Sequence, residues 1–336
     1  MSEVVIITEA NCQVASGHLY ESVVLANQLI NKRIAVEILY NSTILPQWRG
    51  ILNNIPGNEY QETINESIDE VVKFIWQSHC KCVVTNLREV KDTQISKIKE
   101  SYDGKIICID EWGKRPLHCD IVINNMLNSA YWDYKGSVEK KYCGVKYLSL
   151  PEKLVGYHAK KKVIRPEIKN IVVSMGGVDK YNHTSEIVDF ILDNMKFAHL
   201  DIILGGGYTQ KESLEKRLES ESCISIHQNV DYIYDLFYEA DLAFSAGGNT
   251  MYELAAIGTP TIIYPTMEHE RENAEAFMQM GFGSVILKCD DIKMKDISYR
   301  NRKNFMLAGK SLVDGKGVNR ITKVVMECLS DRTSQI

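Results

Sequence analysis

Residues 242–264 read LAFSAGGNTMYELAAIGTPTIIY, in which an apolar run, two glycines, a helix-forming stretch and a second apolar run follow one another. Glycines directly after a strand let the backbone approach an anion closely. The N–H groups and the positive dipole end of the next helix can then hold a phosphate. The segment therefore predicts a strand, a phosphate-binding turn and a helix. The alternative is a tight strand-to-helix turn that binds nothing.

Polar residues after this glycine pair extend the prediction. Asn249 or Thr250 is placed to cap the helix. Glu253 falls about one turn into it. A carboxylate there can accept hydrogen bonds from both hydroxyls of a ribose.

Two further glycine turns support the same interpretation. Gly176 and Gly177 follow an apolar run, with Asn182 just after them, and residues 205–207 form a third, all-glycine turn. The carboxyl ends of parallel strands meet at one edge of a sheet. Three such turns therefore favour a phosphate-binding rim over three idle turns.

Short apolar runs alternate with longer amphipathic stretches through the whole chain, which predicts parallel α/β sheets. One helix is expected at residues 17–31. Strands are expected at residues 4–8, 34–40, 81–85, 105–109, 120–123, 171–174, 200–204, 223–226, 242–245, 261–264 and 284–287.

The stretch at residues 151–168 has a basic cluster, two prolines and little periodicity, which is typical of a linker. We expect an N-terminal Rossmann-like domain at residues 1–150 and a C-terminal one at 169–315. A final helix at 316–336 is expected to pack back on the first domain. Two such halves predict a ligand site in a cleft between them, at the carboxyl ends of their strands.

The composition excludes several classes of protein. The chain has 336 residues, 45% hydrophobic and 25% charged, with a formal net charge of -5. These values are typical of a globular protein and not of a disordered chain or a general nucleic-acid binder. No apolar run reaches the roughly 18 residues of a membrane helix, and the N-terminus lacks the pattern of a secretory signal. Nine irregularly spaced cysteines predict reduced thiols in a cytoplasmic protein and no metal site. No cofactor is expected.

The first domain offers a candidate for proton transfer. Gly17 and His18 lie between the first expected strand and the first helix, at the carboxyl edge of that sheet. A histidine near its usual pKa of about 6.5 suits proton transfer at neutral pH. The alternative is a histidine that caps the helix or only lines the cleft.

Other candidates have strong structural alternatives. Acid–base or sugar-contacting residues that can equally be helix starts are Asp110, Glu111, Trp112, His269, Glu270 and Asn273. Aromatic residues that can stack on a sugar or pack in the core are Tyr131, Trp132 and Tyr134. The lysines at 160–162 are most simply part of a solvated linker.

Four segments resemble the GT-B superfamily, and within it the UDP-sugar hydrolases of pseudaminic acid synthesis and the spore-coat polysaccharide proteins. They are SGHLYESVVLANQLI, IDEWGKRPLHCDIVIN, VVSMGGVDKYNHTSEIV and FSAGGNTMYELAAIGTPTIIYP, the last of which also resembles the transferase of lipid II synthesis. DGKGVNRI at residues 314–321 is similar to the family's closing segment.

The resemblance implies two Rossmann-like domains facing across a cleft and a role for each site residue. The second domain would hold a nucleoside diphosphate, with Glu253 on the ribose and the backbone near Ile226 on the uracil. His18 would activate or align water, and Asn182 and Asn273 would contact the substrate. The residues implied for phosphate binding are Ser245, Gly247, Gly248 and Asn249.

Two departures from the hydrolase pattern weaken the assignment of the reaction. The family's acidic-His-Tyr turn is replaced by Asn86, Leu87 and Arg88, which suggests that a supporting polar cluster is lost. Pro151 stands where the hydrolase has an arginine. The leading hypothesis is a hydrolase of a UDP-linked deoxyamino sugar in surface-polysaccharide or nonulosonic acid synthesis. The alternatives are a GT-B glycosyltransferase with a glycan, lipid or peptide acceptor, and a non-catalytic nucleotide-sugar-binding protein.

Overall fold

The computed structural model describes residues 2–10, 16–44, 46–52, 55–61, 63–88, 90–110, 116–129, 133–134, 136 and 138–330, without the side chains of Gln47, Asn65 and His269. The chain forms two compact units. The first contains residues 1–152 together with 316–336, and the second contains residues 153–315. The C-terminal segment thus belongs to the first unit.

The first unit is built on a seven-stranded sheet in the order β3-β2-β1-β4-β5-β6-β7, in which all neighbours pair in parallel. Its central strands are buried on both faces, as parallel sheets are. The strands are β1 (Val4–Thr8), β2 (Val36–Asn41), β3 (Gly57–Tyr60), β4 (Cys82–Asn86), β5 (Lys105–Ile109), β6 (Cys119–Asn124) and β7 (Val138–Cys143).

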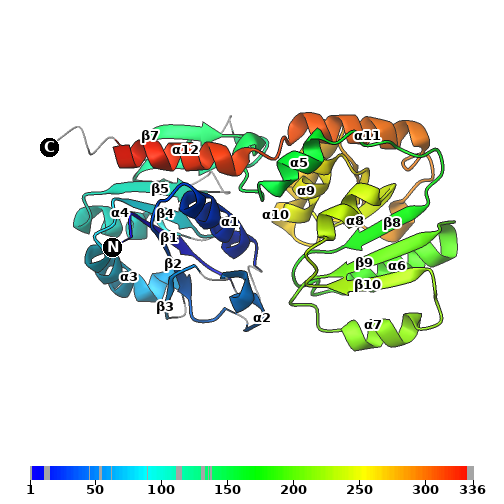
Figure 1. The fold of residues 1–336 in the computed structure, drawn as a ribbon, viewed down its shortest axis with the longest axis horizontal. Helices are drawn as coiled ribbons and strands as arrows, with labels where there is room; N and C mark the ends of the chain where they lie inside the picture. Colours follow the sequence, from blue (N-terminus) through cyan, green and yellow to red (C-terminus); the bar gives the residue numbers. More distant parts are fainter. Residues whose placement is uncertain are drawn as a thin grey trace. The chain divides into compact units, whose positions relative to one another are not determined.

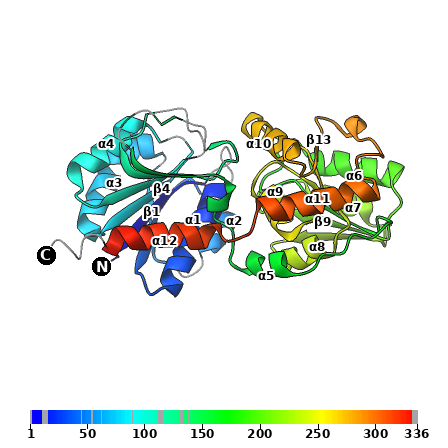
Figure 2. The same cartoon turned by 90° about the horizontal axis from the view of Figure 1, so that it is seen from above.

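Helices cover both faces of this sheet. Figure 2 shows α3 and α4 on one side and α1 and α12 on the other. The helices of the first unit are α1 (Gly17–Asn31), α2 (Pro46–Arg49), α3 (Ile64–Ser78), α4 (Asp92–Ser101) and α12 (Gly317–Ser330), with 3-10 turns η1 (Gly50–Leu52) and η3 (Val145–Tyr147). The apolar face of α12 packs against α1 and β4, which ties the end of the chain to this sheet.

The second unit repeats the architecture with a six-stranded parallel sheet in the order β10-β9-β8-β11-β12-β13 (Figure 1). The strands are β8 (Asn170–Ser174), β9 (His199–Leu204), β10 (Ile224–Gln228), β11 (Leu242–Ser245), β12 (Thr261–Ile263) and β13 (Ser284–Val285).

One face of this sheet packs against α6 and α7 in a single apolar core. Helix α9 contacts α5, α8 and α11 and forms a second layer with them. The helices are α5 (Lys153–Ala159), α6 (His183–Asn194), α7 (Lys211–Leu218), α8 (Ile233–Glu239), α9 (Asn249–Ile257), α10 (Glu268–Gln279) and α11 (Tyr299–Leu312), with a 3-10 turn η4 (Cys289–Asp291).

The predicted fold class is confirmed, and every predicted strand is present within a few residues of its predicted bounds. Two strands, β3 and β7, were not predicted because their sequences are polar. The sequence of β3 is GNEY and that of β7 is VEKKYC, and both lie at sheet edges, where one side of the strand faces water and apolar alternation is not required.

The stretch predicted as a linker contains structure. Helix α5 lies within it and packs on α8 and α9. The expectation that the lysines at 160–162 are solvated is wrong for Lys162, which is 8% exposed. Its Nζ donates to the carbonyl oxygens of Phe237 at 3.2 Å and Ala240 at 2.8 Å, and also to that of Tyr238. A buried cation thus caps the C-terminal end of α8, where the helix dipole is negative.

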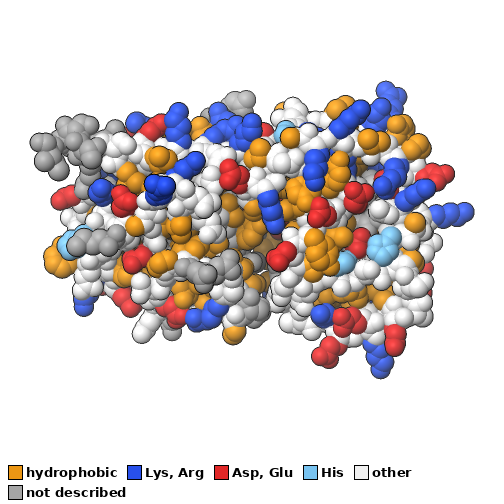
Figure 3. Space-filling model, viewed as in Figure 1, with side chains coloured by type: hydrophobic (Ala, Val, Ile, Leu, Met, Phe, Trp, Pro, Cys, Tyr) orange, Lys and Arg blue, Asp and Glu red, His pale blue; other side chains and the backbone are white. Residues whose placement is uncertain are grey.

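Surface and composition agree with a globular protein. Acidic and basic side chains are interspersed on the face drawn in Figure 3. No helix in the described ranges is long and apolar enough to cross a membrane. The cysteines that the structure describes are free thiols, and most are buried.

Candidate functional site

The carboxyl edge of the second sheet carries the glycine turns that the sequence analysis singled out. The turn after β11 contains Gly247 and Gly248, and α9 begins directly after it. A Cβ on Gly247 would lie 2.8 Å from the Cβ of Glu270 and 2.9 Å from its carbonyl oxygen. Only glycine fits there, because α10 approaches the turn closely.

The first turn of α9 is not capped by its own side chains. Gly248 is the N-cap residue, and its carbonyl accepts from the N–H of Met251 at 3.0 Å. Neither Asn249 nor Thr250 caps the helix as predicted, because both lie inside it. Within the described part of the chain, no side chain accepts from the backbone N–H groups of residues 248–250. These N–H groups therefore offer donors to an external acceptor.

Ser245 lies at the end of β11 and is fully buried. Its hydroxyl donates to the carbonyl of Ala246 at 2.9 Å. The hydroxyl that the resemblance implies for phosphate is thus engaged within the turn.

Glu253 lies on α9, 6% exposed. Its Oε1 accepts a hydrogen bond of 2.7 Å from the hydroxyl of Tyr234 on α8. This contact fixes the carboxylate beside the first turn of α9, which is the position predicted for a ribose-binding group.

Two residues of α10 lie on the side of that helix that faces the glycine turn. Glu270 Oε1 is 3.2 Å from the point where a Cβ of Gly248 would stand, while its Oε2 accepts from the N–H and hydroxyl of Thr266 at 2.8 and 2.9 Å. Asn273 follows one turn later, so it shares that face. It is 5% exposed, and its Oδ1 has no partner among the described residues. A buried amide oxygen without a protein partner can accept a hydrogen bond from a ligand or a water.

The turn after β8 is built differently. The carboxylate of Asp179 accepts from the backbone N–H groups of His183 and Thr184, both at 2.9 Å. Asn182 is held by two side chains: its Oδ1 accepts from the Tyr208 hydroxyl at 2.6 Å, and its Nδ2 donates to Gln210 at 2.8 Å. The start of α6 is therefore closed by the protein's own groups.

The glycines of that turn pack on the next one. A Cβ on Gly205 would lie 2.3 Å from the carbonyl oxygen of Gly176, and the N–H of Gly207 donates to the carbonyl of Gly177 at 2.8 Å. Ile226 lies within β10, where it pairs with Ile202. The loop after β10 begins with Asn229 in a left-handed conformation, at φ 56°.

In the first unit, His18 lies in the first turn of α1 and is 8% exposed. Its Nδ1 is 3.0 Å from Oδ1 of Asn86, the last residue of β4. The suggestion that residues 86–88 no longer support the histidine is therefore wrong for Asn86. Sequence could have pointed to the pair: β4 follows β1 in the sheet, and Asn86 is in register with Thr8 at the same edge.

The remaining candidates of the first unit lie near this edge. Gly17 begins α1. Asp110 follows β5, is 1% exposed, and its N–H donates to the carbonyl of Ile123 at 2.9 Å. Tyr134 belongs to the core, because it is 4% exposed and accepts from Asn124 Nδ2 at 2.6 Å. Burial, and next the charge of Asp110, raise the pKa of the Tyr134 hydroxyl. Glu111, Trp112, Tyr131, Trp132 and the side chain of His269 lie outside the described residues.

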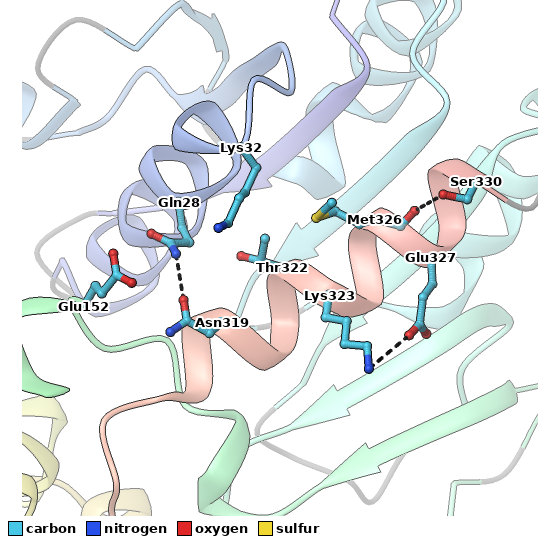
Figure 4. A pocket seen from close by; sticks show the side chains of 9 residues that line it. All are labelled: Gln28, Lys32, Glu152, Asn319, Thr322, Lys323, Met326, Glu327 and Ser330. Atoms are coloured by element: carbon cyan, nitrogen blue, oxygen red, sulfur yellow. Dashed lines mark hydrogen bonds and ion pairs between the residues drawn. The ribbon is translucent and has the colours of Figure 1, made fainter.

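One groove of the first unit lies away from these residues. A groove of about 600 Å³ separates the C-terminal half of α1 from α12 (Figure 4). Gln28 Nε2 crosses it to Asn319 Oδ1 at 2.7 Å. Gln28 is ten residues beyond His18 on α1, about 15 Å along the helix axis. The groove therefore belongs to the packing of α12 and not to the sheet edge. In the described part of the chain no cluster of His, Cys, Asp and Glu could hold a metal ion.

Comparison with known proteins gives distant relatives. No family model matches the chain. It is 23% identical over 289 residues to an uncharacterised protein of Methanocaldococcus jannaschii, covering 82% of this chain and 58% of that protein. It is 27% identical over 253 residues to the spore coat polysaccharide biosynthesis protein SpsG of Bacillus subtilis, covering 69% and 72%. It is 26% identical over 183 residues to the UDP-2,4-diacetamido-2,4,6-trideoxy-beta-L-altropyranose hydrolase of Campylobacter jejuni, covering 54% and 62%.

Solved structures share the whole fold. MurG of Acinetobacter baumannii superposes with a TM-score of 0.67 at 12% identity, over 97% of this chain and 99% of that one. The spinosyn forosaminyltransferase SpnP superposes with a TM-score of 0.62 at 14% identity, over 97% and 99%. At such identities the likeness concerns the fold. Together with the two parallel sheets, it shows that the chain has the GT-B fold of two Rossmann-like domains.

Proposed function

We propose that this chain is a nucleotide-sugar-dependent enzyme that holds a nucleoside diphosphate at the start of α9. The observation that carries the proposal is the open first turn of α9, with its uncapped N–H groups behind Gly248. The diphosphate supplies the acceptors that this helix end lacks, and the helix dipole stabilises its charge.

The surroundings of that turn suit the rest of a nucleotide-sugar. Glu253, oriented by Tyr234, accepts hydrogen bonds from the ribose hydroxyls. Asn273 Oδ1, which lacks a partner among the described residues, accepts from a hydroxyl or amide of the sugar. The Glu253 contact is charge-assisted and the Asn273 contact is a buried polar one, and contacts of these kinds contribute most to specificity.

We take the nucleotide to be UDP, because two kinds of relative carry UDP-sugars in their names. One is the hydrolase of Campylobacter jejuni. The other is the UDP-N-acetylglucosamine transferase of lipid-linked peptidoglycan synthesis from Acetivibrio thermocellus, 27% identical over 189 residues, which cover 52% of this chain and 50% of that enzyme.

Our preferred reaction is hydrolysis of a UDP-linked deoxyamino sugar. Water attacks the anomeric carbon and loses a proton to His18, while the bond from that carbon to the diphosphate oxygen breaks and UDP leaves. The charge that develops on UDP is stabilised by the N–H groups of α9, and the resemblance implies no metal or cofactor. The products are UDP and the free sugar.

A GT-B glycosyltransferase is the second candidate, and the likeness to the peptidoglycan transferases favours it. In that reaction His18 takes the proton of an acceptor hydroxyl in place of water. The third alternative, a binding protein without catalysis, loses part of its basis because His18 keeps a buried partner in Asn86.

A product assay separates these candidates. The purified chain is incubated with UDP-N-acetylglucosamine and UDP-diacetamido-trideoxyhexoses, with and without glycan or lipid-linked acceptors, and UDP and free sugar are followed by chromatography. Free sugar released in buffer alone supports hydrolysis, and UDP released only with an acceptor supports transfer. His18→Ala should abolish turnover while leaving UDP affinity within about twofold. UDP binding without turnover of any of these sugars would favour the third alternative, a nucleotide-sugar-binding protein without catalysis.

A further inference from the structure

We propose that Asn86 and Glu21 act as positioning residues that hold the His18 ring with its proton on Nδ1 and its lone pair on Nε2. The proposal rests on the proposed function only for its kinetic consequence, because the proton position is a property of the protein without substrate. Three buried residues carry it: His18, Asn86 and Glu21, which are 8%, 1% and 2% exposed.

The orientation of the Asn86 amide is fixed by its neighbours. Its Nδ2 is surrounded by acceptors: the His18 carbonyl at 3.2 Å, Glu21 Oε2 at 3.4 Å and Ser22 Oγ at 3.3 Å. An amide nitrogen carries two protons and accepts none. A flipped amide would place its oxygen against the Glu21 carboxylate and a carbonyl oxygen, which repel it. Oδ1 therefore faces His18.

The amide orientation decides the tautomer of the ring. Asn86 Oδ1 lies 3.0 Å from His18 Nδ1 and can only accept a hydrogen bond. The neutral imidazole must donate from Nδ1, which leaves the lone pair on Nε2. This is the form that can take a proton from a nucleophile.

Glu21 is itself held in place. It lies one turn after His18 on α1, and its backbone carbonyl accepts from Ser149 Oγ at 3.0 Å. Other charged groups at this edge of the sheet are Glu9, Arg88 and Asp110, and Glu9 Oε1 accepts from the Arg88 N–H at 2.6 Å. The Asn86 amide thus links the Glu21 carboxylate to the ring.

The test reads the tautomer by nitrogen-15 NMR of histidine-labelled protein without substrate, with the His18 signal assigned by its loss in His18→Ala. We expect the Nδ1–H form in the wild type. Asn86→Leu should shift His18 toward the Nε2–H form that free imidazole side chains prefer, and lower kcat by about tenfold or more with KM nearly unchanged. Thr85→Val is the control, since Thr85 adjoins Asn86 in β4, and its hydroxyl has no partner among the described residues. It should leave the tautomer unchanged.

Asn86→Asp keeps the test decisive if the leucine variant fails to fold, because the side chain keeps its shape. A carboxylate in contact with the ring should raise the pKa of His18 by about one unit or more. An Nε2–H ring in the wild type, or a His18 pKa unchanged in Asn86→Asp, would overturn the inference. An Nδ1–H ring in a protein that turns over no UDP-sugar would instead remove the proposed function and leave the inference standing.

Discussion

Helices α6 and α9 follow the same sequence pattern and begin in different ways. Each comes after a parallel strand and a glycine pair, and the strands before them, β8 and β11, are neighbours in one sheet. The N–H groups at the start of α6 are bound by the Asp179 carboxylate. The start of α9 has Gly248 at the N-cap and no side-chain oxygen of its own.

The contrast between α6 and α9 shows that a glycine pair after a strand does not by itself define an anion site. A carboxylate built into the loop takes the place that a phosphate would fill and satisfies the same donors. Of the rim of three turns expected from sequence, we therefore assign the diphosphate to α9. Three changes test this assignment, in order of falling expected effect, and a fourth tests the buried lysine at the end of α8.

The largest effect is expected from making α9 begin like α6. Gly248→Asp places a carboxylate at the N-cap, where it binds the helix N–H groups and repels phosphate. Gly248 has φ −87° and ψ −155°, which other residues adopt. A Cβ there would stand 3.2 Å from Glu270 Oε1, the far end of a side chain, so the variant should fold once that side chain shifts. UDP affinity measured by calorimetry should fall by about 100-fold.

Gly248→Asn is the matched control for this variant, because it caps the helix without the charge. Its loss of affinity should be clearly smaller than that of Gly248→Asp. Equal UDP affinity in Gly248→Asp and the wild type would show that the diphosphate does not bind at α9.

Glu253→Ala sharpens the assignment by probing the ribose. It removes an acceptor that Tyr234 orients, and UDP affinity should fall by about tenfold, because charge-assisted hydrogen bonds contribute about 1.5–3 kcal/mol. Tyr234→Phe should weaken UDP less. Unchanged calorimetric affinity in Glu253→Ala would remove the ribose role.

Asp179→Ala opens α6 in the way that α9 is open. The helix loses its carboxylate acceptor, so the free energy of unfolding should fall by about 1 kcal/mol in urea titrations. UDP affinity should stay within about twofold. A large loss of affinity with an intact fold would place the nucleotide at α6 instead.

The smallest effect is expected for Lys162, which binds carbonyl groups at the negative, C-terminal end of α8. Burial lowers the pKa of this lysine to about 7. Between pH 7 and the ordinary lysine pKa of 10.5, the unfolded chain binds more protons than the folded one, so the free energy of unfolding rises with pH. From pH 7.0 to 7.5 we expect a gain of about 0.4 kcal/mol, measured by urea unfolding, which Lys162→Met should abolish. The same slope in the variant would contradict it.

Apolar alternation predicted the parts of the fold that it controls. The bounds of β1, α1, β5 and β11 match prediction because their burial demands strand or helix periodicity. Edge strands β3 and β7 lack that demand. From sequence, Lys162 is predicted to be solvated, because its neighbours in the chain give no sign of the carbonyl groups that it binds. These carbonyls lie at the end of α8, 75–78 residues further along the chain.

Site residues could be placed at the sheet edges from sequence, but not their partners. The sequence around Asp179 does not show whether its carboxylate binds the N–H groups of the following helix or a ligand, because a carboxylate can do either. In the sequence Asn86 reads as the loss of a polar group, because its residue type differs from the family pattern. Its role depends on contact with His18, which lies 68 positions away on another element.

A crystal structure of the chain soaked with UDP would show which helix N-terminus holds the diphosphate. We predict the diphosphate on the backbone N–H groups at residues 248–250 of α9, with the ribose hydroxyls on Glu253. Diphosphate bound at α6 after displacement of Asp179, or no nucleotide in the second unit at saturating UDP, would contradict the account.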